Sequence, residues 1–274
     1  MKQSTKDKVK KITEQLEAGV QELFSSDRYA AYLTIMSKFH RYSVNNCLLI
    51  HLQRPEATYV AGFKKWNEMG RHVKKGEKAI TILAPIQRKY VVETENDDGE
   101  KIAEEHKYMA FMPASVFDIS QTEGEELPTI MTALTGEAEA GLLEKIISIS
   151  PVPVRFEEIS GDVKGYYNRT GYIAIKTGMS GVQSVKTLLH EIAHAILHSK
   201  EGAEKDADRN TKEVQAESTA FTVSKYLGLD TSDYSFGYIA GWSSGKSADE
   251  LRNSLEVIRG TANDIISRLE AVCP

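Results

Sequence analysis

The amino-acid sequence predicts an α+β fold in two domains, and three observations lead to this prediction. Apolar residues recur every three to four positions near the N-terminus and again from residue 180 onward, which is typical of amphipathic helices. The segments between these helices carry strand and turn signals. The charge also divides, because residues 1–92 contain 17 Lys and Arg against 8 Asp and Glu, whereas residues 93–274 contain 17 against 31. We therefore expect a basic domain over residues 1–125 and a second domain over residues 126–274.

Helices are expected through most of the N-terminal part of the first domain. The second of them is expected over about residues 28–40, and the third over about residues 43–53, where Pro55 stops it because the residue before a proline avoids helical geometry. A short fourth helix is expected over residues 61–70. The first helix precedes these and has an apolar face formed by Val9, Ile12, Leu16, Val20 and Leu23.

A β-hairpin is expected after these helices. A basic turn leads into a strand over residues 79–86, and a returning strand is expected near residues 107–116. The dipeptide Asp98-Gly99 between them is a typical hairpin turn. Residues 120–128 are polar and acidic and contain Gly and Pro, so we interpret them as the linker between the domains.

The composition is that of an ordinary globular protein, with 41% hydrophobic and 27% charged residues. No apolar run approaches the ~18 residues of a membrane span, so no membrane partner is expected. The first residues lead directly into a helical pattern without the apolar region of a signal peptide. Cys47 and Cys273 are too few for a disulfide framework, which favours a reducing, cytoplasmic location.

The residues that say most about chemistry are His190, Glu191 and His194, which form a His-Glu-x-x-His pattern. Residues four apart share one face of a helix, so both imidazoles can bind one metal ion, with Glu191 beside them as a candidate general base. The alternative is a surface helix whose histidines recur at this spacing by accident. A capping pattern of Ser180 and Gln183, and an apolar face opposite the histidines, favour a helix that lines an active-site cleft.

A zinc hydrolase needs a third protein ligand and an open fourth position. His198 is a poor candidate for that ligand, because eight residues separate it from His190 on one helix, which is about 12 Å along the axis. One ion with bonds of about 2 Å cannot reach both side chains. The third ligand is therefore expected from another segment.

A second helix downstream offers that ligand. It is expected to begin after the start signal Asn210-Thr211 and to end at Gly228, and it carries Glu213 and Glu217 on one face. We assign Glu213 as the third zinc ligand and Glu217 as the partner that orients a histidine N–H group. The alternative for Glu217 is an ordinary solvated carboxylate.

This spacing resembles that of the gluzincins, in particular the small ImmA/IrrE-like metallopeptidases. In those proteins the first glutamate of the downstream helix binds zinc and the acidic residue four positions later supports a histidine. Here those positions are Glu213 and Glu217, where relatives often carry Asp or Asn instead of Glu217. The resemblance implies zinc-dependent amide hydrolysis, with a zinc-activated water and Glu191 as general base. Aromatic residues before the metal helix, which also favour strands for structural reasons, are candidate oxyanion stabilisers: Tyr166, Tyr167 and Tyr172.

Aromatic, basic and amide residues alternate in the N-terminal region. Single-stranded nucleic acid is bound by aromatic stacking along a positively charged groove, and these residues could form one. The alternative explanations are solvated lysine faces for the charge and core packing for the i,i+3 pair Phe63 and Trp66. The candidate DNA-binding residues are Tyr42, Asn46, Tyr59, Lys64, Trp66, Arg71, Lys74 and Lys75.

Several separate blocks of the first domain resemble the N-terminal domain of the ArdC family of antirestriction proteins. Members of this family, LtrC-like proteins among them, occur on conjugative plasmids and integrative elements. The resemblance implies a single-stranded-DNA-binding domain followed by a metallopeptidase-like domain, and the metal motif follows here in that order. The blocks are residues 39–46, 53–55, 60–66, 70–78 and 116–122.

Three functional hypotheses remain open from the sequence. The first is a cytoplasmic antirestriction protein of a conjugative mobile element, which shields incoming single-stranded DNA and carries a zinc peptidase site for an unknown protein or peptide. The second is an ImmA-like regulatory peptidase that cleaves a specific repressor. The third is a DNA-binding protein whose zinc is only structural.

Overall fold

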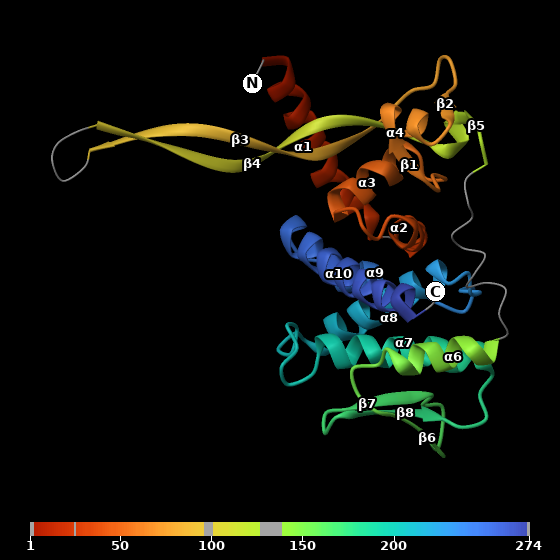
Figure 1. Cartoon of the computed structure of the whole chain (residues 1–274). Coiled ribbons are helices and arrows are strands. Elements are labelled where there is room, and N and C mark those ends of the chain that lie inside the picture. The colour runs from red at the N-terminus through yellow and green to blue at the C-terminus, as the bar shows by residue number, and fades with distance from the viewer. Residues whose placement is uncertain (1–2, 25, 96–100, 127–138, 273–274) are drawn as a thin grey trace. The chain divides into compact units, whose positions relative to one another are not determined.

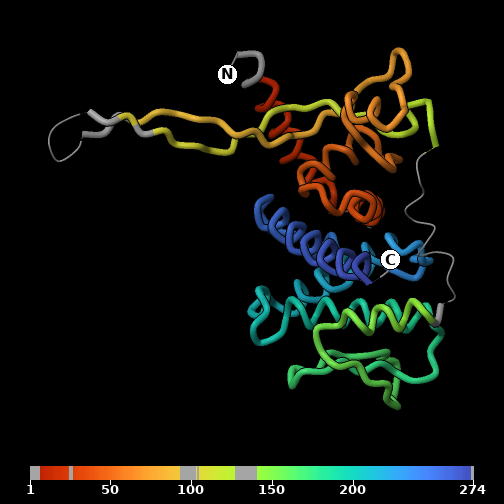
Figure 2. The backbone as a smooth tube through the Cα atoms, in the orientation of Figure 1, coloured from red at the N-terminus to blue at the C-terminus, as the bar shows by residue number. Residues whose placement is uncertain are grey.

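The computed structural model describes residues 3–24, 26–95, 101–126 and 139–272, as Figure 1 shows. These residues form two compact units. Unit 1 contains residues 1–16 and 60–125, and unit 2 contains residues 17–59 and 126–274. The chain therefore enters unit 2 before it completes unit 1, and the backbone trace in Figure 2 can be followed through both. A boundary between sequence domains at residue 125 stays a prediction, because the packing does not divide the chain at one point.

Unit 1 is built on a three-stranded antiparallel sheet in the order β1-β4-β3. Strand β1 (Val60–Gly62) pairs only with the end of β4 (Lys101–Asp118), whereas β3 (Ile80–Glu95) pairs with β4 along its whole length. The expected hairpin is thus present and longer than predicted, and its two strands continue as a ribbon beyond β1 (Figure 1). The predicted turn at Asp98-Gly99 lies outside the described residues.

The core of unit 1 forms where this sheet meets the short helix α4 (Phe63–Glu68). Trp66 of this helix is fully buried, and its indole N–H donates a hydrogen bond to the carbonyl oxygen of Phe117 at 2.9 Å. Ile80 and Val116 are buried on the same sheet, where they are paired in register. Trp66 is therefore a packing residue, whereas Phe63 on the same helix is 55% exposed.

The interpretation of residues 120–128 as a linker is wrong for its first part. Residues Ile119–Gln121 form a 3-10 helix, η1, and residues Thr122–Gly124 form strand β5, which pairs with β2 (Arg71–Val73). Asp118 caps η1, because its side chain accepts a hydrogen bond from the backbone N–H of Ser120. The polar composition of this segment thus reflects capping and edge pairing rather than an open chain.

Unit 2 contains a three-stranded sheet in the order β6-β8-β7. Strand β8 (Tyr172–Lys176) pairs in parallel with β6 (Val154–Glu157) and in antiparallel with β7 (Gly165–Asn168). Helices α6 (Glu139–Ser148) and α7 (Gly181–Leu197) lie beside one another over this sheet (Figure 1). Their shared core includes Ile146, Ile173, Ile175, Leu188, Leu189 and Ile192, all fully buried.

Two further helices lie on the other side of α7 (Figure 1). Helix α8 (Arg209–Tyr226) packs against both α7 and α10 (Ala248–Val272), and the short α9 (Ile239–Ser243) precedes α10. The start of α8 differs slightly from the prediction, because Asp208, and not Asn210, accepts the capping hydrogen bond, from the N–H of Thr211. Gly228 follows α8 with a φ of 72°, a left-handed conformation that ends the helix as expected.

The N-terminal helices α2 (Ser26–Lys38) and α3 (Val44–Gln53) belong to unit 2, together with the end of α1 (Gln3–Leu23). Helix α2 packs on α8, where the hydroxyl groups of Tyr29 and Ser218 are hydrogen-bonded at 2.8 Å. Helix α3 lies against α10, and the N–H of Val44 donates to the carboxylate of Glu256 at 3.1 Å. These helices therefore complete the core on the side of α8 away from the sheet.

None of the helices in the described part of the chain is both long and apolar enough to span a bilayer.

We expect Tyr29→Ala to destabilise unit 2 by about 3–5 kcal/mol, the usual cost of removing a buried aromatic side chain. The ring is fully buried and contacts Phe236 at a centroid distance of 5.1 Å. Urea unfolding followed by circular dichroism measures the change. Arg28→Ala is the matched control on the same helix, since its ion pair with Glu22 is largely exposed and contributes under about 1 kcal/mol. Equal stability of the two variants would show that α2 is not part of this core.

Candidate metal centre

Helix α7 presents the metal motif on the face opposite to its core. Ser180 caps the helix by accepting a hydrogen bond from the N–H of Gln183, as the sequence predicts. Its apolar face, which includes Leu188 and Ile192, is fully buried. His190 and His194 retain exposed fractions of 21% and 15% because they face a cleft.

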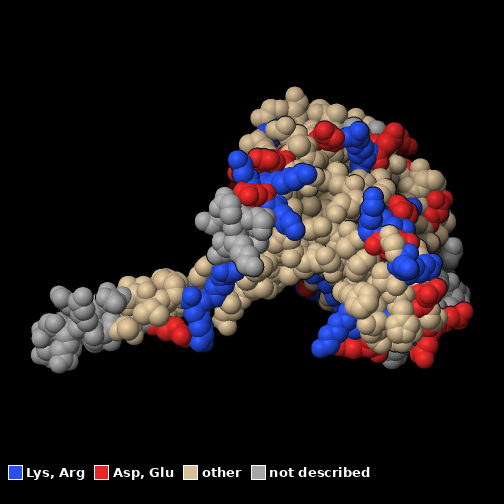
Figure 3. Space-filling model, turned by 90° about the horizontal axis from the view of Figure 1, so that it is seen from above, with Lys and Arg blue, Asp and Glu red and all other residues tan. Residues whose placement is uncertain are grey.

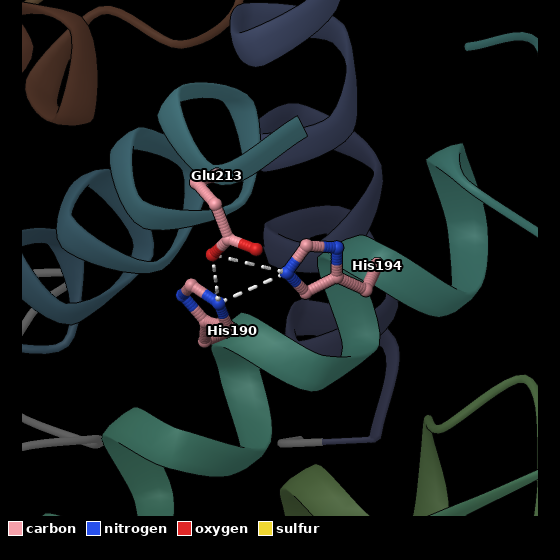
Figure 4. A group of neighbouring side chains, drawn as sticks. All are labelled: His190, His194 and Glu213. Carbon is pink, nitrogen blue, oxygen red and sulfur yellow. Dashed lines mark hydrogen bonds and ion pairs between the residues drawn. The ribbon is translucent and has the colours of Figure 1, made fainter. Parts of the chain in front are cut away.

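The third expected ligand, Glu213 of α8, converges on these histidines (Figure 4). Its Oε2 atom lies 3.5 Å from Nε2 of His190 and 3.7 Å from Nε2 of His194. The two Nε2 atoms are 3.0 Å apart. Three potential ligand atoms from two helices therefore surround one point in space.

These distances fit a tetrahedral metal ion. With metal–ligand bonds of about 2.0–2.1 Å, neighbouring ligand atoms of a tetrahedral site are about 3.3 Å apart. The observed separations of 3.0, 3.5 and 3.7 Å bracket this value, and two imidazoles with one carboxylate are a usual donor set for a catalytic zinc ion. His190, His194 and Glu213 can thus hold a divalent metal ion and leave a fourth position toward the cleft.

His190 lies between two carboxylates in the absence of a metal. Its Nδ1 atom is hydrogen-bonded to Oε2 of Glu217 at 3.0 Å, so Glu217 lies where the sequence assigns it, beside a histidine N–H. Burial lowers the pKa of His190, but the hydrogen bonds with Glu213 and Glu217 outweigh it and raise the pKa to about 10. Hydrogen bonds from the two histidines hold the pKa of Glu213 well below its usual range. Because the pKa of His190 is raised, binding of a metal ion at this imidazole would release a proton.

His198 supports the other histidine instead of binding the metal. It follows the last residue of α7, and its Nδ1 atom lies 2.8 Å from Nδ1 of His194. Its Nε2 atom lies 2.9 Å from Oε1 of Gln215 on α8. The sequence predicts that His198 is not a ligand, and this geometry agrees; its contact with His194 was not predicted. The four-residue spacing from His194 was the available signal.

Glu191 lies next to the ligands with an exposed fraction of 7%. Burial raises the pKa of its carboxyl group, while His190, His194 and the backbone N–H of Tyr167 partly offset this effect. A raised pKa brings a carboxylate closer to the range in which it can accept and return a proton near neutral pH.

The cleft in front of the motif has a volume of about 690 Å³. Tyr166 and Tyr167 of β7 line it, whereas Tyr172 is outside its lining and stacks against Arg155. Tyr234 also lines the cleft, near Lys186, whose ammonium pairs with Asp233 at 2.5 Å. No motif spacing in the sequence indicates that Tyr234, Lys186 and Asp233 belong to this cleft.

The candidate DNA-binding residues are divided between the two units. Tyr42, Asn46 and Tyr59 belong to unit 2, where Asn46 is buried and Tyr59 is 42% exposed. The remaining five, Lys64, Trp66, Arg71, Lys74 and Lys75, belong to unit 1.

Within unit 1, three lysines of the candidate set are on the surface. Lys64, Lys74 and Lys75 are exposed. Arg71 instead joins β2 to β5, because its Nε donates to the hydroxyl of Thr122 at 2.8 Å. Trp66 is fully buried in the core, so it cannot stack on a nucleic-acid base in this conformation.

Comparison with known proteins matches two successive parts of the chain to two families. Residues 2–117 match the family model described as the N-terminal domain of anti-restriction factor ArdC. Residues 149–261 match the IrrE N-terminal-like domain of the M78 peptidases. The chain joins an ArdC-type N-terminal domain to an IrrE-like peptidase domain. The predicted resemblance and the α+β, two-domain class are thereby confirmed.

More distant similarities extend over most of this ArdC-like chain. An uncharacterised protein of Bacillus anthracis is 27% identical over 311 aligned positions, which cover 98% of this chain and 52% of that protein. The chain thus spans about half the length of this curated relative. The metal-free crystal structure of the antirestriction protein ArdC from plasmid R388 is 20% identical, with a TM-score of 0.49 and coverage of 84% of this chain and 86% of that one. The Mn(II)-bound structure is 22% identical, with a TM-score of 0.45 and coverage of 84% and 83%.

We expect the metal-free protein to lose stability as the pH rises from about 6.5 toward 10. The pKa of His190 is raised from 6.5 to about 10 in the folded protein, so the stabilisation from its imidazolium is complete below pH 6.5 and is lost as the pH rises through 10. A metal ion needs the neutral imidazole, so zinc affinity should increase over the same interval. Urea unfolding with a chelator, and zinc titration at matched pH values, measure the two trends. Metal-free stability that increases with pH over this interval would contradict the assignment.

Proposed function

We propose that the peptidase-like half of the protein is a zinc-dependent hydrolase of amide bonds. The observation that carries this proposal is the convergence of His190, His194 and Glu213 beside the buried carboxylate of Glu191. A purely structural zinc site usually has four protein ligands, whereas the described residues bring three to this point, at the edge of an open cleft. The arrangement therefore favours a catalytic site over a structural one.

In this proposal, separate groups at the site have separate roles in amide hydrolysis. A bound zinc ion would supply Lewis acidity that polarises a carbonyl group and acidifies water. Glu191 would accept the proton of the attacking water and return it to the leaving amine. Tyr166, Tyr167 and Tyr234 line the cleft and are candidates for a hydrogen bond to the developing oxyanion.

We further propose that the ArdC-type half binds single-stranded DNA, and that the whole protein protects DNA entering the cytoplasm from restriction. The support is the excess of Lys and Arg in residues 1–92, the exposed Lys64, Lys74 and Lys75, and the match to the ArdC N-terminal domain. On the face shown in Figure 3, Lys and Arg side chains form small groups with acidic side chains beside them. Stacking by exposed aromatic residues such as Tyr59 would add to the electrostatic attraction.

A regulatory peptidase that cleaves a specific protein is the second candidate. The specific observation in its favour is that His190, His194 and Glu213 converge beside the buried carboxylate of Glu191. Shielding DNA by binding would require neither a metal ligand set nor a general base. A variant that keeps the metal but cannot move the proton separates the two functions.

We expect Glu191→Gln to bind zinc normally and to lower peptide hydrolysis about 10²- to 10⁴-fold, because only the proton acceptor is lost. Zinc content, cleavage of a mixed fluorogenic peptide library, and survival of incoming DNA in a restricting host are measured in parallel. His190→Ala is the matched variant that should lose zinc as well as hydrolysis.

The same variant decides between the two candidates. DNA protection that persists in Glu191→Gln supports shielding, and protection that disappears while zinc is retained supports a regulatory peptidase. A wild-type protein that binds no zinc, or that binds it and cleaves nothing, would overturn the hydrolase proposal.

We expect fluorescence anisotropy to show tighter binding of single-stranded than of double-stranded oligonucleotides, and weaker binding at higher salt. The double variant Lys74→Ala, Lys75→Ala should reduce the slope of log affinity against log salt by about 1.4, since each phosphate contact of a single strand contributes about 0.7. Lys89→Ala is the control, because Lys89 already pairs with Glu105 at 2.7 Å. Absence of binding by the wild type at low salt would refute DNA binding by this domain.

A further inference from the structure

A chain of four polar side chains runs from a half-buried carboxylate in the segment between α7 and α8 to one of the candidate metal ligands. Glu204, in the segment between α7 and α8, accepts a hydrogen bond from Nε2 of Gln215 at 3.1 Å. Gln215 Oε1 lies 2.9 Å from Nε2 of His198, and Nδ1 of His198 lies 2.8 Å from Nδ1 of His194. Gln215 is 1% exposed and His198 is 3% exposed, so the central two members have little access to water.

The direction of every hydrogen bond in this chain follows from its first member. A carboxylate only accepts hydrogen bonds, so the amide of Gln215 must turn its NH₂ group toward Glu204. Its carbonyl oxygen then faces His198 and can only accept, which places a proton on Nε2 of His198. A neutral His198 consequently accepts at Nδ1, and His194 must donate from Nδ1–H. The Nε2 atom of His194, which faces His190 and Glu213, is left with a free lone pair.

The backbone of the segment that carries Glu204 holds this residue next to Gln215. The N–H of Glu204 donates to the carbonyl oxygen of Leu197 at the end of α7, at 3.0 Å. Gly202 lies so close to the same carbonyl oxygen that a Cβ atom there would be 2.2 Å from it. Only glycine permits this approach, so the chain returns to the end of the helix and delivers the carboxylate to Gln215.

We propose that Glu204, Gln215 and His198 are positioning residues that hold His194 in its metal-binding tautomer. His190 has a charged partner of its own, Glu217, which accepts from its Nδ1–H. His194 also donates from Nδ1–H, but its acceptor is the neutral imidazole of His198. Gln215 and Glu204 set the orientation of that imidazole through their hydrogen bonds. The inference rests on the proposed metal site and adds to it a device that prepares one ligand before the metal arrives.

The alternative is that these contacts only satisfy buried polar groups between two helices. A structural network would lose stability when broken, but it would leave the tautomer of His194 unchanged in a protein that still folds. The tautomer and the zinc affinity therefore distinguish the two explanations, and thermal unfolding of each variant reports the structural contribution separately.

The experiment uses the full-length protein and three variants. Gln215→Leu removes the acceptor for His198 with little change in volume. Glu204→Lys replaces an acceptor by a donor, whereas Glu204→Asp keeps a carboxylate that can only accept. The proton position on His194 is read by ¹⁵N NMR of the metal-free protein, and the zinc dissociation constant is measured by competition with a chromophoric chelator.

We expect Gln215→Leu and Glu204→Lys to weaken zinc binding about 10- to 100-fold, the usual effect of losing a group that orients a metal ligand. Their NMR spectra should show protonation of His194 at Nε2 in part of the molecules. Glu204→Asp should retain the wild-type tautomer and bind zinc more tightly than Glu204→Lys, because it keeps an acceptor-only group. Because Glu204 is only half-buried, its variants test the proposal even if Gln215→Leu does not fold.

Unchanged zinc affinity and tautomer in a folded Gln215→Leu or Glu204→Lys protein would overturn the proposal. A wild type that binds no zinc is a different result, because it refutes the metal site itself. A wild type that binds zinc but cleaves no peptide leaves this inference standing and removes only the hydrolase.

Discussion

The contact between α7 and α8 is the constraint on which the metal centre depends. Two ligands belong to one helix and are spaced by its geometry, but the third comes from a different helix, so the approach of the two axes sets its distance. Small side chains at Ala193, Ala216 and Ala220 are fully buried, and they allow the helices to come close. Because the same helices also carry Glu217 and His198, a small change in their packing would alter the ligands and their supports together.

The opposite side of α8 depends on residues that precede it by almost two hundred positions. Tyr29 of α2 and Ser218 of α8 are both fully buried where these two helices pack together. Ser218 directly follows Glu217 in the sequence. The family match to the ArdC N-terminal domain covers α2 and α3, yet these helices fold as part of the unit that contains the metal centre. A sequence domain and a folding unit are therefore different things in this protein. Tyr42 and Asn46, two of the residues proposed to bind DNA, are part of the unit that contains the candidate metal site.

Periodicity predicted the helices, because a helix is a local property of the sequence. Motif spacing predicted the candidate ligands, because residues four apart share one face of a helix. His190, Glu191 and His194 needed only one helix, and Glu213 needed one more whose start was marked by polar residues. The burial of Trp66 could not be decided in the same way, since an aromatic residue on a short helix serves packing and stacking equally well. The pairing of β5 with β2 joins segments about fifty residues apart, and nothing in a polar, acidic stretch indicates such a partner. Lys186, Asp233 and Tyr234 meet at the cleft for the same non-local reason.

The two histidine ligands are supported in physically different ways, and the difference bears on the charge of the centre. His190 donates to a carboxylate, which makes its imidazole more electron-rich, whereas His194 donates to a neutral imidazole. Glu213 and Glu217 already bring two carboxylates to this site, and a carboxylate in place of His198 would add a further negative charge beside His194. A neutral relay orients His194 without adding this charge, which gives a physical reason for a histidine at this position.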